Sequence, residues 1–290
     1  MKTLNKIKKT EIKNICLFTV RALEPSFVGQ GGHMKLAFIS DIHANLPALN
    51  AVLKDIEKHN PDDVFCLGDL VNFAGWDNEV ITLIRKNHIT CLQGNHDEGI
   101  GYHKRDFSFS YKNEAQKLFG LESIQRVSKS ITEENRNYIS CLPFMLKLEF
   151  HFPFHNIRMA MVHGSISSNN EYVKKDVSDE YLLEMMDAIE ADILLMGHTH
   201  VPFHRAIYCE EENRKIYKHA INVGSVGKPK HGDNKSCYAM VGINHETDLS
   251  NPESVKVQFE YVDYNVKKVM NKIHFLGLGK AYDEFLKTGV

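Results

Sequence analysis

The sequence has no apolar run that approaches the ~20 residues required by a membrane-spanning helix. It also has no strong excess of one charge, because 35 Lys and Arg residues stand against 37 Asp and Glu residues, for a formal net charge of -2 at pH 7. Binding to nucleic acid through its phosphates needs clustered Lys and Arg. The first absence argues against a membrane partner, and the second argues against bulk binding of nucleic acid.

Cysteines are few and widely spaced, with six in 290 residues and none in a C-x-x-C pair. Three of them lie inside or beside apolar runs, where a small thiol packs well. Reduced thiols are the normal state in the cytoplasm. We therefore expect reduced cysteines in the core of a cytoplasmic protein.

The first 33 residues are rich in lysine and lack clear periodicity. Their apolar part, residues 15–20, is too short for the core of a signal peptide, and Arg21 interrupts it. The segment ends in Gly31-Gly32-His33-Met34, which resembles a cloning scar or an upstream start. We predict that residues 1–33 are a leader or a disordered extension, with a functional basic arm as the alternative. Residues 34–290 are then a single domain.

From Met34 onward, short apolar segments alternate with amphipathic ones, a pattern typical of α/β layering. The expected strands are residues 35–39, 64–67, 89–92, 146–150, 157–162 and 193–196. The expected helices are residues 47–59, 78–86 and 178–190, with further helical patterns within 98–145.

The final third of the chain changes character. Strands are expected at residues 216–222, 237–243 and 255–262, with few helices between them, before a last helix that begins near residue 265. Strands that follow one another through turns are typical of antiparallel pairing. We therefore expect this third to form a second, more antiparallel sheet.

Polar side chains that can bind a metal follow the ends of the expected strands. The first strand ends in Asp41 and His43, which point the same way in an extended segment because they are two residues apart. Parallel strands deliver such groups to the carboxyl edge of their sheet. The complete set of strand-end groups is Asp41, His43, Asp69, Asn95, His96, Asp97, His163, His198 and His200.

These groups are mixed nitrogen and oxygen donors without a thiolate. Such a set suits Mn²⁺, Fe²⁺ or Zn²⁺ better than a structural zinc, which favours cysteine, or Mg²⁺ and Ca²⁺, which favour oxygen alone. Read singly, each group also has a structural explanation, such as a helix cap for Asp41 or a buried histidine at 163. Together and in order, they indicate a metal site that could hold two ions ~3.5–4 Å apart.

The blocks D-x-H, G-D, G-N-H-D, H-G and G-H-T-H occur in this order, and the chain thereby resembles the calcineurin-like metallophosphoesterases. The continuation His200-Val201-Pro202, together with residues 222–227, resembles the small bacterial phosphodiesterase-like branch of that superfamily. The resemblance covers nearly the whole chain from Met34. It implies an α/β fold, a four-layer αββα sandwich of two mixed β-sheets flanked by helices.

The resemblance also implies two metal-binding groups and a mechanism. One ion is held by Asp41, His43, Asp69 and His200, and the other by Asp69, Asn95, His163 and His198, so that Asp69 is the bridge. Two divalent ions are implied, Mn²⁺ first, with Fe²⁺, Zn²⁺ or Ni²⁺ as alternatives. A hydroxide held between them attacks phosphorus in line, and His96 assists the leaving oxygen. We expect Asp97 to orient the His96 imidazole and favour its protonated form.

The leading functional hypothesis is a phosphodiesterase that acts on a small or nucleotide-derived ester. Ser/Thr protein phosphatases of the superfamily have Glu where this chain has Asp97, and they add arginines with no clear equivalents here. A phosphomonoesterase or protein phosphatase is therefore the alternative, followed by a nuclease. A non-catalytic scaffold is the alternative from another class, against which the full ligand set argues. A homo-oligomer remains open.

A basic loop formed by Lys228, Lys230 and His231 follows the Asn222–Gly227 segment. We interpret this loop as a solvated turn. Contact with an anionic substrate is the alternative.

Overall fold

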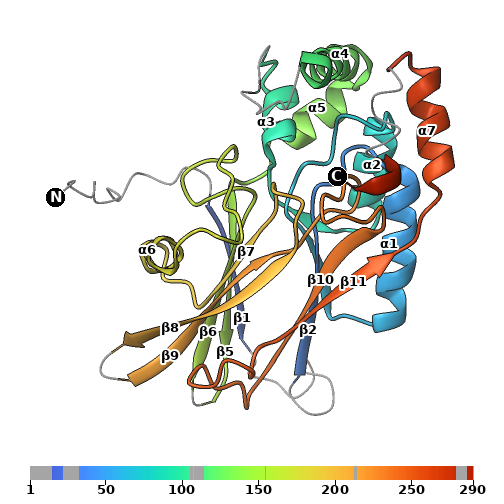
Figure 1. Ribbon diagram of the computed structural model, residues 1–290. Coiled ribbons are helices and arrows are strands. Elements are labelled where there is room, and N and C mark those ends of the chain that lie inside the picture. The colour runs from blue at the N-terminus through green and yellow to red at the C-terminus, as the bar shows by residue number, and fades with distance from the viewer. Residues whose placement is uncertain are drawn as a thin grey trace.

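A computed structural model describes residues 15–21, 33–104, 107, 114–153, 155–211, 214–278 and 286–289 of the chain. Two mixed β-sheets pack face to face, and helices cover their outer faces (Figure 1). This arrangement confirms the predicted αββα sandwich. Among the residues described, no helix is both long enough and apolar enough to cross a membrane.

The five-stranded sheet has the order β11-β10-β2-β3-β4. Its parallel part consists of β2 (His33–Ile39), β3 (Asp63–Cys66) and β4 (Thr90–Cys91). Strand β10 (Ser236–Asn244) runs antiparallel to β2 on one side and to β11 (Lys256–Val262) on the other. The last two strands of the chain therefore extend a sheet that the first strands began.

The six-stranded sheet has the order β1-β5-β6-β7-β9-β8. Its strands are β1 (Ile15–Arg21), β5 (Met145–His151), β6 (Asn156–Val162), β7 (Ile193–Met196), β8 (Phe203–Glu211) and β9 (Arg214–Asn222). Parallel pairing joins β6 to β7 and β7 to β9, whereas β5–β6 and β8–β9 are antiparallel pairs. The carboxyl ends of β6 and β7 therefore lie at one edge.

Seven helices lie in the described part of the chain: α1 (Leu46–His59), α2 (Asp77–Lys86), α3 (Asn95–Gly101), α4 (Glu114–Ser130), α5 (Glu133–Ser140), α6 (Asp179–Ala188) and α7 (Val266–Phe275). Several begin where a side chain accepts a backbone N–H that the helix itself leaves unpaired. Asn45 accepts from Ala48 N at 3.1 Å, and Ser178 accepts from Tyr181 N at 3.2 Å.

Alternation along the strands separates the core into layers. In β2, Leu36 and Phe38 face the other sheet, whereas Ala37 and Ile39 face the cluster that contains α1 and α2. The inter-sheet layer also receives Met159 of β6. Residues of α6 form a third cluster on the outer face of the six-stranded sheet. Both faces of the central strands are thus buried, as their near-continuous apolar sequences require.

The final third of the chain does not form a sheet of its own, so that prediction is wrong. Strand β9 pairs with β7, and β8, which the sequence did not predict, pairs with β9. Strands β10 and β11 instead join β2 in the other sheet. Strands that follow one another through turns correctly predict antiparallel pairs. They do not predict which distant strand each pair will join.

Strand β1 is a second feature that the sequence did not predict. Residues Ile15–Arg21 pair in parallel with β5 at the edge of the six-stranded sheet. Residues 1–14 and 22–32 lie outside the described residues. The proposal that the domain proper starts at Met34 stays a prediction.

The cysteines were expected in the core, and most of the described ones are at least half-buried. Cys66, Cys91 and Cys237 are buried, Cys209 is half-buried, and Cys141 is exposed. All five are free thiols. That these cysteines are reduced in the cell stays a prediction, and the prediction of a core position is wrong for Cys141, which follows the last residue of α5.

The loop after β9 is hydrogen-bonded to the loop that follows β2. Val226 N donates to Ser40 O and Gly227 N donates to Asp41 O, each at 2.9 Å. A Cβ atom on Gly227 would lie only 1.7 Å from Ile42 O, which is far inside van der Waals contact. The two loops can therefore approach this closely only because residue 227 is glycine.

Gly227→Ala should separate these loops and lower the free energy of unfolding by on the order of 1–3 kcal/mol, the usual cost of forcing extra volume into packed structure. Chemical denaturation of the purified protein measures this change. Gly242→Ala is the matched control, because a Cβ on Gly242 of β10 would make ordinary contact at 3.5 Å from Lys256 Cβ. Equal free energies of unfolding for the two variants would contradict the conclusion that the loops need glycine at residue 227 to approach each other.

Candidate metal centre

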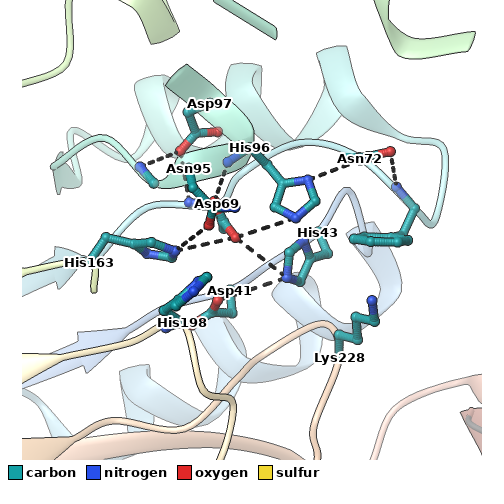
Figure 2. Close-up of polar contacts among 12 residues, drawn as sticks. Asp41, His43, Asp69, Asn72, Asn95, His96, Asp97, His163, His198 and Lys228 are labelled. Atoms are coloured by element: carbon teal, nitrogen blue, oxygen red, sulfur yellow. Dashed lines mark hydrogen bonds and ion pairs between the residues drawn. The ribbon is translucent and has the colours of Figure 1, made fainter. Parts of the chain in front are cut away.

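Side chains from both sheets meet where the strands end (Figure 2). The loop after β2 supplies Asp41 and His43, and the loop after β3 supplies Asp69. The remaining predicted ligands are Asn95 at the start of α3, His163 directly after β6, and His198 and His200 after β7. All seven are at most 4% exposed. The structure therefore brings together every residue that was predicted to bind metal.

One group consists of Asp41, His43 and His200, whose ligand atoms all lie within 4.8 Å of one another. His200 Nε2 lies 3.0 Å from Asp41 Oδ1, and the Nε2 atoms of His43 and His200 are 3.1 Å apart. Two imidazole nitrogens that face each other across a carboxylate form a set of donors suited to one divalent cation.

The second group consists of Asp69, His163 and His198, with Asn95 beside it. His163 Nε2 lies 3.3 Å from Asp69 Oδ2 and 2.9 Å from Asn95 Oδ1. His198 Nε2 is buried and has no hydrogen-bond partner among the described residues. A buried polar atom without a partner is costly in a folded protein, and a bound cation would satisfy it.

Asp69 stands between the two groups. Its Oδ1 accepts the backbone N–H of His96 at 2.8 Å, which fixes the carboxylate. Its Oδ2 lies 3.3 Å from His163 Nε2 and 3.7 Å from His43 Nε2. The same oxygen therefore faces one histidine from each group.

Backbone carbonyls fix two of the imidazole rings. His163 Nδ1 donates to Leu67 O at 2.7 Å, and His200 Nδ1 donates to Lys228 O at 2.5 Å. Donation from Nδ1 orients each ring so that Nε2 faces the carboxylates. Both rings thus present Nε2 as the atom that a cation could bind.

Burial also selects the neutral form of several histidines. It lowers the pKa of His96 and His198 to about 3 and that of His200 to about 4, because an imidazolium loses its hydration inside the protein. Burial acts in the same direction on His163, but the Asp69 carboxylate overcomes it and raises the pKa of His163 to about 10. A cation at this position would take the place of that proton.

Five of the seven predicted ligands have a left-handed backbone. The φ angles are 53° for Asp41, 49° for His43, 57° for Asp69, 64° for His198 and 62° for His200. Residues other than glycine adopt this region at an energetic cost, and such residues cluster at functional sites. The packing of the strand-end loops maintains these conformations.

His96 faces the same cluster but is oriented by a residue that the sequence analysis did not identify. The Asn72 amide group donates from Nδ2 to His96 Nδ1 at 2.9 Å. The orientation of that amide follows from its oxygen, which accepts from Phe73 N at 2.9 Å and from Ser123 Oγ. The ring proton of neutral His96 is therefore on Nε2, 3.8 Å from Asp69 Oδ2. The sequence signal for Asn72 is only its place in the loop that carries Asp69.

Asp97 does not orient His96, so that expectation is wrong. Its Oδ2 accepts from Asp69 N at 2.7 Å and Gly94 N at 3.0 Å, and its Oδ1 accepts from Leu70 N at 2.9 Å. The carboxylate thus ties the loop after β3 to the start of α3. It positions the backbone of Asp69 instead of the imidazole next to it in sequence.

The basic loop is not the solvated turn that the sequence suggested. Lys228 and Lys230 are half-buried, and Lys228 Nζ lies 3.4 Å from the centroid of the Phe73 ring. His231 contacts the ring of Tyr261 instead. Lys228 therefore reaches the aromatic residue beside the predicted ligands.

Residues 34–246 match the family model described as the calcineurin-like phosphoesterase superfamily domain. Because the match covers most of the chain and the His and Asp groups lie where such an enzyme needs them, the chain belongs to the calcineurin-like phosphoesterase superfamily. Its class is that of a metal-dependent phosphoric ester hydrolase.

Three known proteins are similar to this chain. An uncharacterised protein of Methanocaldococcus jannaschii is 32% identical over 250 residues, which cover 82% of this chain and 91% of that protein. The structure of a metallophosphoesterase from Sphaerobacter thermophilus has a TM-score of 0.64 at 25% identity, over 89% of this chain and 99% of the other. A hypothetical protein from Pyrococcus horikoshii has a TM-score of 0.66 at 20% identity over the same shares, and this likeness shows the fold alone.

Asp69→Asn should bind Mn²⁺ at least ~10–100-fold more weakly than the natural sequence, because changes even to groups behind a metal ligand have costs of that size. Elemental analysis after loading and desalting measures the retained ion. Asp187→Asn is the control, since Asp187 is an exposed carboxylate that pairs with Lys218 at 2.6 Å. Retention of the full Mn²⁺ content by Asp69→Asn would contradict the prediction that Asp69 is a metal ligand.

Proposed function

We propose that this chain is a phosphodiesterase whose site holds two divalent cations, Mn²⁺ first among them, on either side of Asp69. The observation that carries the proposal is the position of Asp69 Oδ2 between His163 Nε2 at 3.3 Å and His43 Nε2 at 3.7 Å. A carboxylate oxygen that faces ligands of both groups is what a shared, bridging ligand requires.

In this proposal, Asp41, His43, Asp69 and His200 hold one ion, and Asp69, Asn95, His163 and His198 hold the other. Bound there, the ions would lower the pKa of water for in-line attack on phosphorus and offset charge on the phosphoryl oxygens. Fe²⁺, Zn²⁺ and Ni²⁺ suit the same donors, and availability decides among such ions as much as ligand type.

His96 is the proposed group that assists the leaving oxygen. Because Asn72 fixes the tautomer, the Nε2–H of His96 is directed toward the ligand cluster. Burial keeps the ring neutral, so it acts as a hydrogen-bond donor to the leaving oxygen as negative charge develops there. The role of Asp97 is to position the backbone of Asp69 and the start of α3.

Charge favours a diester over a monoester. A monoester dianion needs more positive charge around its phosphoryl group than a diester monoanion does. The two arginines nearest in sequence to the motifs are engaged elsewhere: Arg158 pairs with Asp192 at 2.9 Å, and Arg205 pairs with Asp179. A small or nucleotide-derived diester is therefore the substrate class that we propose, and a phosphomonoester is the alternative.

We also propose a cytoplasmic location. Five cysteines are free thiols, which is the normal state in the cytoplasm. Free thiols support this proposed location. The full set of metal donors argues against a non-catalytic scaffold of the same fold.

The substrate class is tested with Mn²⁺-loaded protein on matched aryl diesters and monoesters. We expect kcat/KM for the diester to exceed that for the monoester. The reverse ranking would overturn the diester assignment, and no turnover of any phosphoester would overturn the enzymatic one.

His96→Ala should lower kcat by ~10²–10⁴-fold, the range for loss of a group that assists proton movement or charge at the leaving atom. Its Mn²⁺ content should stay close to that of the natural sequence, because the proposed ligands are intact. Asn72→Ala should lower kcat by less. His245→Ala, at an exposed turn after β10, serves as the control. Unchanged kcat in His96→Ala would remove His96 from the mechanism.

A further inference from the structure

We propose that Lys228 is a substrate-binding residue whose ammonium group holds a phosphoryl oxygen of the bound phosphoester beside the metal ligands. The inference rests on the proposed phosphoesterase function and adds an anion-binding residue that the motifs do not contain. The ligand chemistry is that of a phosphoryl group, which both the substrate and the product phosphate can supply.

The backbone of Lys228 is fixed directly to the predicted metal ligands. Its carbonyl accepts from His200 Nδ1 at 2.5 Å. Its N–H donates to Ser225 Oγ at 2.9 Å, and that hydroxyl donates to Asp41 O at 2.8 Å. The starting point of the side chain is therefore set by hydrogen bonds to two ligand residues.

The side chain is held at its other end as well. Lys228 Nζ lies 3.4 Å from the centroid of the Phe73 ring, which is a cation–π contact. Phe73 in turn packs edge-on against His43, with ring centroids 5.0 Å apart, and against His96 at 5.1 Å. Figure 2 shows Lys228 on the same side of the ligand cluster as His43. The ammonium is thus placed beside one ligand group and the proposed leaving-group donor.

Burial and the neighbouring Lys230 hold the pKa of Lys228 well below its usual range, and an anion bound beside it would offset both effects. Divalent ions in the two ligand groups would repel a nearby ammonium strongly, since water is excluded from the site. A phosphoryl group between them would be attracted by both. Hydrogen bonds to charged groups are also stronger than those between neutral groups. Lys228 would supply a single cation to the phosphoryl group, which agrees with a singly charged diester as the proposed substrate.

A purely structural role is the competing explanation, in which the aliphatic stem of Lys228 only packs on Phe73. Lys228→Met keeps a stem of similar length and removes the charge. Lys228→Arg keeps the charge. Lys228→Gln is a second neutral variant in case the methionine disturbs folding. Lys235→Met is the matched control, because Lys235 lies near the same loop but pairs with Asp263 at 3.4 Å.

The first measurement is calorimetric binding of inorganic phosphate to the Mn²⁺-loaded full chain. We expect Lys228→Met to bind phosphate ~10–100-fold more weakly, the range for loss of one hydrogen bond to a charged group, with unchanged Mn²⁺ content. Lys228→Arg should recover most of the affinity, and Lys235→Met should match the natural sequence. Equal phosphate affinity in Lys228→Met and the natural sequence, or no phosphate binding by either, would overturn the proposal.

The second measurement is turnover of a diester. KM should rise in Lys228→Met by more than kcat falls, and Lys228→Arg should reverse the change. Normal KM in Lys228→Met would overturn the role of Lys228 while leaving the proposed function intact. If the natural sequence hydrolyses no phosphoester, the proposed function fails, and the phosphate-binding measurement still decides the role of Lys228.

Discussion

The carboxylate of Asp69 is the constraint on which the site depends. One of its oxygens is fixed by the backbone of His96, and the other faces histidines from both ligand groups. Asp97 holds the Asp69 backbone, and Gly94 provides the space for it, since a Cβ on Gly94 would lie 2.2 Å from Asp69 Oδ1. Several loops are therefore built around the position of one side chain.

The packing of the two sheets brings the other predicted ligands to Asp69. Asp41, His43 and Asp69 come from the ends of strands in one sheet, and His163, His198 and His200 come from the other. Packing of the sheets through their shared apolar layer brings the strand ends together. The left-handed conformations of five ligand residues are a local energetic cost that this packing offsets. Stability of the core and geometry of the site are thus coupled.

Much of this arrangement could be predicted from the sequence, because strand-end chemistry is a local signal. All seven expected ligands converge, and the αββα class is correct. The assignment of strands to sheets could not be predicted, since β8 to β11 are distributed by long-range pairing. The roles of Asn72, Asp97 and Lys228 were equally inaccessible. Each depends on a contact across loops: Asn72 reaches His96, Asp97 reaches the Asp69 backbone, and Lys228 reaches Phe73.

The most direct test of the account is a crystal structure of the Mn²⁺-loaded protein with anomalous data at the manganese edge. The account predicts two anomalous peaks ~3.5–4 Å apart, with the Asp69 carboxylate in contact with both. One peak would mark an ion bound by Asp41, His43 and His200. The other peak would mark an ion bound by Asn95, His163 and His198. A single peak, or two peaks of which only one contacts Asp69, would contradict the bridging carboxylate.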